Sequence, residues 1–469
     1  MSELATLTAT GLVDRYRRKD LSPVEVTDAV LTRIDTCNPA VNAFRIVDPD
    51  HARASAKASE DRWSRGDPCG LLDGVPTTIK DIILTKGWST LRGSETVDPN
   101  QAWDEDSPCT ARLREHGAVL LGKTTTPEFG WKGITDSPLT GITRNPWNTD
   151  RTPGGSSGGA AAACALGMGA LHIGTDGGGS IRIPAGFAGV FGHKPSFGRV
   201  PLWPSSAFGS LSHVGPMTRT VGDAALMLNV LAEPDARDWT ALPYDGRDYR
   251  DGLETGIEGR RIALSLGLGY VSAVDSEIAN LVRAAARVLE DLGASVEEVD
   301  PGFDDPYETF RRHWFGVAGK LVADMTPQQR AAVDPGLRET AAAGAKITHN
   351  EFLEAVENRN AIGETMSRFH ENYDLLLTPT LPIPAFKVGQ ETPGPLTDAR
   401  WAAWTPFTFP FNLTQQPVAS VPCGFTADGL PAGMQIVGPR YADMMVLQAA
   451  RAYETACPFR MPNEPNVQH

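Results

Sequence analysis

The sequence predicts a single α/β domain in which helices flank a central mixed β-sheet. From about residue 71, short apolar runs such as GVPTTIKDII (74–83) and GAVLLGKT (117–124) alternate with helical stretches and Gly/Pro turns, a pattern typical of layered strands and helices. The 469 residues are enough for a large hydrophobic core, and no internal repeat or long linker divides them. One interwoven domain is therefore favoured over two.

Helices are expected at the N-terminus. The segment SPVE at 22–25 is a capping box with proline at the first helical position, and valine or isoleucine then recurs at helical spacing. This pattern predicts a helix over about 23–36. We expect residues 1–65 to form an N-terminal helical segment packed on the core, and residues 66–469 to form the main domain.

A second helical region interrupts the strand pattern later in the chain. Residues 301–370 are mostly helical in pattern, and strand-like sequence resumes only at DLLLTPT (374–380). We expect this region to form a helical excursion over the sheet.

Composition excludes several classes of partner. The chain is 41% hydrophobic and 21% charged, with a net charge of −14, which opposes binding to nucleic acid and to anionic membranes. Its first twenty residues lack the basic head and apolar stretch of a secretory signal. The six cysteines have no CxxC spacing, so we expect reduced thiols and neither a disulfide framework nor a zinc site. These features predict a cytoplasmic protein.

The run GAVLLGKT at 117–124 matches the phosphate-loop pattern G-x-x-x-x-G-K-[ST]. A phosphate loop is a flexible turn, whereas the residues between these glycines are strand-like and Pro127 follows closely. Nucleotide binding is therefore kept only as the alternative from a different functional class.

The most informative stretch is GGSSGGAAAACALGMGALHIGTDGGGSIRIPAG, residues 154–186. It joins two serine-bearing glycine clusters through a helix-forming alanine-rich segment and a strand-like ALHIGT. GGSSGG alone is typical of a flexible loop, but a linker would not lie in the most apolar part of the chain. Successive glycines let several backbone N–H groups point at one spot, which is the geometry of an oxyanion hole beside a serine.

A serine nucleophile needs a base. His172, His193 and His213 are the histidines nearest in sequence to these serines, and we expect them to be structural. Lys80 is the best candidate, because it is a lone cation in an apolar run and burial lowers the pKa of a lysine. The alternative is that Lys80 pairs with Asp81.

The order of motifs resembles the amidase signature family. The matching segments run from about residue 70 to 440 and read GVPTTIKD, GKTTTPEFG, TPGGSSGG, GTDGGGSIRIPAG, GHKPSFGRV, GPMTRTVGDAA and GLPAGMQIVGPR. The resemblance implies the fold of that family, a mixed β-sheet flanked by helices, and a Ser–cis-Ser–Lys triad. It assigns Lys80 as base, Ser156 as the bridging serine in a cis peptide, and Ser180 as nucleophile.

The same resemblance implies supporting roles near the triad. The N–H groups of Gly177, Gly178, Gly179 and Ser180 would hold the oxyanion. Ser157 is the rival for the bridging role and is expected to support the network by hydrogen bonding. Asp176 and Arg182 are expected to pair and hold the loop, and no metal or organic cofactor is needed.

One position departs from the family pattern. Relatives commonly carry threonine where this chain has Gly177, which predicts a more flexible loop and a larger neighbouring pocket.

The expected substrate is a small molecule. The family includes broad amidases, aryl acylamidases, carbamate hydrolases and the glutaminase subunit of tRNA-dependent amidotransferases, which would need an acidic residue near WAAWTPFTFPFNLTQQP (401–417). That segment contains none. Aromatic residues could line an apolar or aryl pocket or belong to the core. The pocket candidates are Trp203, Phe208, Trp404 and Phe407.

We therefore expect a serine amidohydrolase that cleaves small uncharged, apolar or aryl amides through an acyl-enzyme. Carbamates (urethanes) and aryl esters are the alternative substrates, and a glutaminase subunit is disfavoured. The expected oligomeric state is a monomer or a homodimer.

Overall fold

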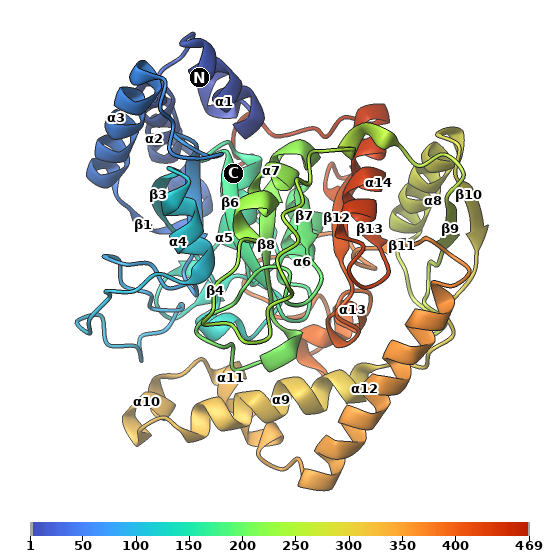
Figure 1. Cartoon of the computed structure of the whole chain (residues 1–469). Helices are drawn as coiled ribbons and strands as arrows, with labels where there is room; N and C mark the ends of the chain where they lie inside the picture. The colour runs from blue at the N-terminus through green and yellow to red at the C-terminus, as the bar shows by residue number, and fades with distance from the viewer. Residues whose placement is uncertain (1–2, 468–469) are drawn as a thin grey trace.

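The computed structural model describes residues 3–467, and an eleven-stranded mixed sheet runs through them (Figure 1). Its strands lie side by side in the order β1-β3-β2-β6-β8-β7-β12-β13-β11-β9-β10. Their bounds are β1 (Phe44–Val47), β2 (Pro76–Lys80), β3 (Val119–Thr124), β6 (Leu171–Asp176), β7 (Phe191–Lys194), β8 (His213–Thr218), β9 (Arg261–Leu264), β10 (Ser295–Glu298), β11 (Leu375–Pro379), β12 (Val418–Phe425) and β13 (Pro431–Val437). A separate pair is formed by β4 (Asp136–Ser137) and β5 (Gly141–Ile142). The predicted fold class is confirmed.

The sheet contains both parallel and antiparallel strand pairs. β2 is parallel to both β3 and β6, whereas β6 pairs with β8 in antiparallel register. Because parallel neighbours end at the same edge, the carboxyl ends of β2 and β6 bring Lys80 and Asp176 to one place. The sheet therefore assembles residues that are far apart in sequence.

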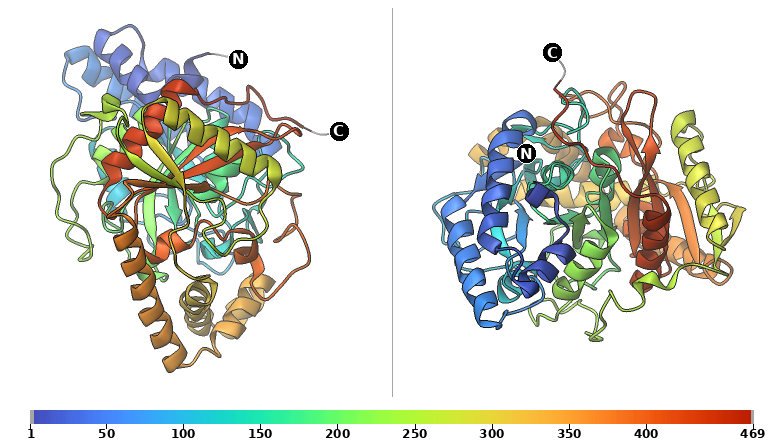
Figure 2. Two further views of the ribbon diagram at one scale, coloured as in Figure 1. Left: turned by 90° about the vertical axis from the view of Figure 1, so that its right-hand side faces the viewer. Right: turned by 90° about the horizontal axis from the view of Figure 1, so that it is seen from above.

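Helices cover both faces of the sheet (Figure 2). Alternate residues of one strand face opposite cores: Ala419 and Val421 of β12 belong to one core, and Val418 to the other. The helices on the first face include α7 (Val221–Leu231), α8 (Ser276–Asp291) and α14 (Asp443–Ala456), and those on the second are α5 (Gly158–Ala165) and α6 (Arg182–Ala188). No helix of residues 3–467 combines the length and apolar character that crossing a bilayer requires.

The N-terminal region is helical but also supplies an edge strand. Its helices are α1 (Ala9–Arg18), α2 (Pro23–Val41) and α3 (Pro49–Arg65). The predicted capping box begins α2, which continues past residue 36 to a left-handed C-cap at Asn42. The apolar and β-branched run Phe44–Val47 then pairs with β3. Within the described residues 3–65, the chain thus contributes both helices and one strand of the main sheet.

The expected helical excursion is present. It consists of α9 (Tyr307–Ala323), α10 (Pro327–Ala332), α11 (Pro335–Gly344) and α12 (His349–Phe369), which lie below the sheet in Figure 1. Its buried aromatic side chains join a second core beside the glycine loop that precedes Ser180. The remaining helical segments are α4 (Pro108–Glu115), α13 (Pro410–Leu413) and the 3-10 turns η1 (Glu3–Thr6), η2 (Glu128–Gly130), η3 (Gly209–Leu211), η4 (Leu253–Thr255) and η5 (Arg400–Trp404).

The phosphate-loop match is a buried strand. Val119–Thr124 is β3, and Lys123 is fully buried with its Nζ donating to the Ile83 carbonyl oxygen at 2.9 Å. A strand in the middle of a sheet cannot wrap a phosphate, so nucleotide binding through this segment is wrong.

The contact between α9 and α11 predicts a stability effect. A Cβ added at Gly344 would lie 1.8 Å from the Phe315 carbonyl oxygen, so Gly344→Ala must push the two helices apart. We expect a loss of about 1–3 kcal/mol in the free energy of unfolding, measured by thermal and denaturant unfolding. Gly363→Ala in α12 is the matched control because a Cβ there meets nothing within 4 Å. An equal effect of both substitutions would contradict the packing.

Candidate active site

Lys80 lies at the centre of a buried group of hydroxyls. Its Nζ is 2.7 Å from Ser156 Oγ, 2.9 Å from Ser157 Oγ and 2.8 Å from Thr175 Oγ1. The lysine is fully buried, and burial lowers its pKa well below the ordinary value while the charge of Asp176 opposes that shift. Burial among neutral hydroxyls favours the uncharged form of the Lys80 amine.

Lys80 does not pair with Asp81, the alternative left open by the sequence. The Asp81 carboxylate contacts Arg45 Nε at 2.6 Å and Lys123 Nζ at 3.2 Å. The Asp81 carboxylate is therefore paired with those two cations, and Lys80 instead contacts the two serine hydroxyls. The contrast is visible in Lys123, whose pKa burial lowers only to about 8 because the adjacent Asp81 favours the charged form.

The hydrogen bonds distinguish the two adjacent serines. Ser157 Oγ donates to the Thr175 carbonyl oxygen at 3.2 Å, so its proton is directed away from Lys80. The hydroxyl of Ser156 contacts only Lys80 among the residues that the structure describes, and the Gly155–Ser156 peptide is cis. A neutral amine has two N–H donors and one lone pair, so one neighbouring hydroxyl must donate to it, and Ser156 is free to do so.

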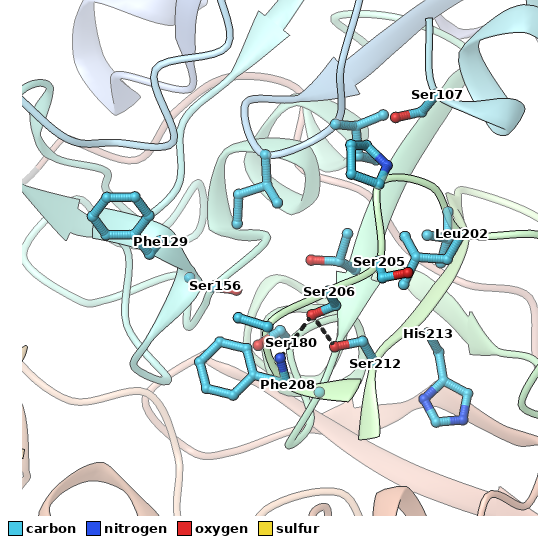
Figure 3. A pocket seen from close by; sticks show the side chains of 18 of the residues that line it. Ser107, Phe129, Ser156, Ser180, Leu202, Ser205, Ser206, Phe208, Ser212 and His213 are labelled. Carbon is cyan, nitrogen blue, oxygen red and sulfur yellow. Dashed lines mark hydrogen bonds between the residues drawn. The ribbon is translucent and has the colours of Figure 1, made fainter. Parts of the chain in front are cut away.

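Ser156 and Ser180 line one cavity, shown in Figure 3. Ser180 follows the glycine loop after β6, is 5% exposed, and its carbonyl oxygen accepts from the Ser157 N–H at 3.1 Å. Within residues 3–467 the Ser180 hydroxyl has no hydrogen-bond partner. It is therefore available to a molecule in the cavity.

An ion pair holds the loop between β6 and α6. The Arg182 guanidinium donates to Asp176 at 2.9 and 3.0 Å, and both side chains are fully buried. Burial disfavours ionisation of Asp176, but the guanidinium outweighs it and holds the pKa of the carboxyl well below its usual range. Arg182 also donates to Gln435 and Asn412, which ties the loop to the C-terminal part of the chain.

The loop offers fewer oxyanion donors than the sequence suggested. The Gly179 N–H donates to Asp176 Oδ1 at 2.9 Å and is not available to a ligand. The N–H groups of Gly177, Gly178 and Ser180 have no acceptor in the described part of the chain. We therefore correct the expected set by removing Gly179.

Close packing explains the glycines of this loop. A Cβ at Gly178 would lie 2.8 Å from the Trp401 ring and 2.9 Å from the Phe310 ring. A Cβ at Gly177 would lie 3.0 Å from Trp314. The space left by the missing threonine side chain is thus filled by Trp314, which corrects the expectation of a larger pocket at this point.

The four aromatic pocket candidates divide into two groups. Trp203 and Phe208 line the cavity, and the Phe208 ring stacks on Trp314 with centroids 3.8 Å apart. Trp404 and Phe407 are not among the lining residues; they are 4% and 0% exposed and belong to the second core. Their place in the core corrects the expectation for these two.

The histidines have structural settings. His213 lines the cavity, but its Nδ1 lies 2.9 Å from the Leu211 carbonyl oxygen, and burial lowers its pKa well below the ordinary value. Burial also lowers the pKa of His172 to about 3, and its Nδ1 lies 2.8 Å from Thr78 Oγ1. In the described residues neither ring bonds to Ser156 or Ser180.

Sequence reasoning missed Thr175, the third hydroxyl around Lys80. Thr175 and Lys80 belong to adjacent parallel strands, but the register between them is set by pairing such as Ile79 with Ile173. No signal in the sequence reports that register. Once the strands are paired, Thr175 is the expected neighbour of the lysine.

Comparison with known proteins identifies the family of this chain. A family model described as Amidase matches residues 25–447. An acylamidase of Rhodococcus erythropolis is 36% identical over 97% of this chain and 96% of its own length. A glutamyl-tRNA(Gln) amidotransferase chain of Synechococcus sp. (strain CC9902) is 36% identical over 96% of both proteins.

Solved structures give the same result. A bacterial aryl acylamidase of the amidase signature enzymes superposes with a TM-score of 0.88 at 36% identity, covering 96% of each chain. A 6-aminohexanoate cyclic dimer hydrolase complexed with substrate superposes with a TM-score of 0.89 at 29% identity, covering 98% of this chain and 99% of the other. The chain belongs to the amidase signature family.

Proposed function

We propose that this amidase-family hydrolase of carbon–nitrogen amide bonds uses Lys80 as base, Ser156 as proton relay and Ser180 as nucleophile. The observation that carries this proposal is the contact of the buried Lys80 Nζ with Ser156 Oγ at 2.7 Å, beside a cavity that Ser156 shares with Ser180.

In the proposed acylation, a proton first passes from Ser180 to Lys80 through Ser156, and a proton then returns through Ser156 to the substrate. Ser180 Oγ attacks the amide carbonyl carbon while its proton passes to Ser156, whose own proton passes to the lone pair of Lys80. The proton then returns through Ser156 to the amide nitrogen, and the C–N bond breaks. The amine departs, and the acyl group remains on Ser180 as an ester. Water attacks this ester by the same proton route, which releases the acid and restores Ser180.

The glycine loop would stabilise the charge that develops on the substrate oxygen. The N–H groups of Gly177, Gly178 and Ser180 are the proposed donors, because the structure leaves them without partners. The ion pair of Asp176 and Arg182 is proposed to fix their direction without touching the substrate.

We further propose a substrate with an apolar or aryl group next to the amide. Ile82, Leu202 and Phe208 give this cavity an apolar wall, and the resemblance to an acylamidase supports the same class. Carbamates and aryl esters remain the alternative substrates for the same triad. Glutamine is disfavoured despite the amidotransferase relatives, because the described residues that line the cavity include no Asp or Glu to pair with its ammonium group.

Loss of the nucleophile tests the assignment. We expect Ser180→Ala to lower kcat by about 10⁴-fold or more with an unchanged thermal midpoint, because the hydroxyl forms the covalent intermediate. The measurement is product release from an acyl anilide, an aryl carbamate, an aryl ester, an aliphatic amide and glutamine. Normal hydrolysis by this variant would contradict the proposal, and a preference for glutamine would contradict the substrate class.

The lowered pKa of Lys80 predicts the pH dependence. The base is the neutral amine, so kcat/KM should rise as pH increases through the lowered pKa and become level while still below the ordinary lysine value. Lys80→Ala should remove both the activity and this rise of kcat/KM with pH. A wild-type profile that is flat between about pH 5 and 9 would argue against a lysine base.

The two adjacent serines give a matched comparison. Ser156→Ala should lower kcat by about 10²–10⁴-fold because it removes the relay, whereas Ser157→Ala should cost much less because that hydroxyl donates to the Thr175 carbonyl. Steady-state kinetics of both variants on one anilide measures the difference. Equal losses would show that the two hydroxyls are not distinguished in this way.

A further inference from the structure

An arginine without a partner lines the same cavity. Arg92 lies in the connection between β2 and α4 and is partly buried. Among residues 3–467 its guanidinium has neither a hydrogen-bond acceptor nor a carboxylate at ion-pair distance. Arg92 is also the only Arg, Lys, Asp or Glu among the described lining residues. A partly desolvated cation at a cavity wall favours an anion that the protein itself does not supply.

The backbone places Arg92 close to the proposed relay serine. The Arg92 carbonyl oxygen accepts from the Phe129 N–H at 2.7 Å, and Gly130 follows so near to Ser156 that an added Cβ would lie 3.2 Å from Ser156 Oγ. Arg92 and Phe129 both have left-handed φ, 56° and 50°. Such conformations in non-glycine residues cost about 1–3 kcal/mol each and are concentrated at ligand sites.

Behind this wall, positive charge exceeds negative charge. Asp81 is already bound by Arg45 and Lys123, and Arg92 lies near enough to lower the pKa of Lys123 further, after the larger effect of burial. Burial lowers the pKa of Arg92 itself, and Asp81 only partly opposes the shift. One carboxylate thus faces three cations, and only Arg92 opens onto the cavity. A bound anion would balance this excess.

We infer that Arg92 binds a carboxylate on the substrate, separate from the amide that is cleaved. The inference rests on the proposed amidohydrolase function and narrows its substrate class to small amides with an apolar or aryl body and one anionic group. The proposed class differs from the uncharged amides expected from the sequence, which alone does not place Arg92 in the cavity. A planar guanidinium can hold both oxygens of a carboxylate, which orients as well as binds it.

Matched substrates test the inference. 4-Acetamidobenzoate and 4-nitroacetanilide have the same shape but differ in charge on the amine side of the bond. The anilides of (4-carboxyphenyl)acetic acid and (4-nitrophenyl)acetic acid form a second pair, which has the same shape and differs in charge on the acyl side of the bond. The kcat/KM ratio of the charged to the neutral member is measured for wild type, Arg92→Gln, Arg92→Lys and the control Arg53→Gln, which removes an exposed arginine paired with Asp28. Comparing ratios between variants cancels the electronic difference within each pair.

For at least one pair we expect Arg92→Gln to lower this ratio by about 10- to 100-fold, since hydrogen bonds to charged groups have that strength. Arg92→Lys should retain part of the preference, and Arg53→Gln should leave it unchanged. A ratio that is the same in wild type and Arg92→Gln for both pairs would overturn the inference while leaving the hydrolase function intact.

A binding measurement covers the case in which Arg92→Gln is inactive or no anilide is cleaved. Titration calorimetry of benzoate and nitrobenzene with wild type, Ser180→Ala, Arg92→Gln and Arg92→Lys reports the charge preference without turnover. Tighter binding of benzoate that Arg92→Lys partly keeps supports the inference. Equal binding of the two compounds, or binding of nitrobenzene alone, overturns it. Loss of turnover with Ser180→Ala, by contrast, concerns only the proposed function.

Discussion

The site depends on a lysine that is buried away from solvent and forms no ion pair with a carboxylate of the described residues. Lys80 ends a buried strand with Ser156, Ser157 and Thr175 around its Nζ, and the nearest acid in sequence, Asp81, is bound by other cations. Burial in these surroundings makes the neutral amine the favoured form. An unprotonated amine is thereby favoured beside Ser156, the proposed relay hydroxyl.

A second buried charge pair sets the direction of the neighbouring loop. Asp176 uses its carboxylate for Arg182 and for the Gly179 N–H, while the N–H groups of Gly177, Gly178 and Ser180 have no acceptor among the described residues. Removing one partner of such a pair costs about 3–5 kcal/mol. The charge of the same carboxylate partly opposes the lowering of the Lys80 pKa by burial. Loop geometry and base strength are therefore coupled through Asp176.

Local patterns predicted the fold class, the helical excursion and the segments that carry Lys80, Ser156 and Ser180, because capping, periodicity and glycine clusters are written in adjacent residues. The resemblance to the family supplied the proposed roles of these residues. Thr175, the engaged N–H of Gly179 and the core positions of Trp404 and Phe407 depend on strand register and on packing between distant segments. Arg92 was missed for the same reason, since nothing around it in sequence indicates a cavity.

The charge state of Lys80 is the central claim, and nuclear magnetic resonance can measure it directly. Enzyme labelled with [¹³Cε]lysine would be titrated with pH, and the Lys80 signal would be assigned from its absence in Lys80→Met. The account predicts that the Lys80 resonance titrates at a pH well below the ordinary lysine pKa, as burial of the amine requires. A Lys80 signal that stays charged up to the ordinary lysine pKa of about 10.4 would contradict it.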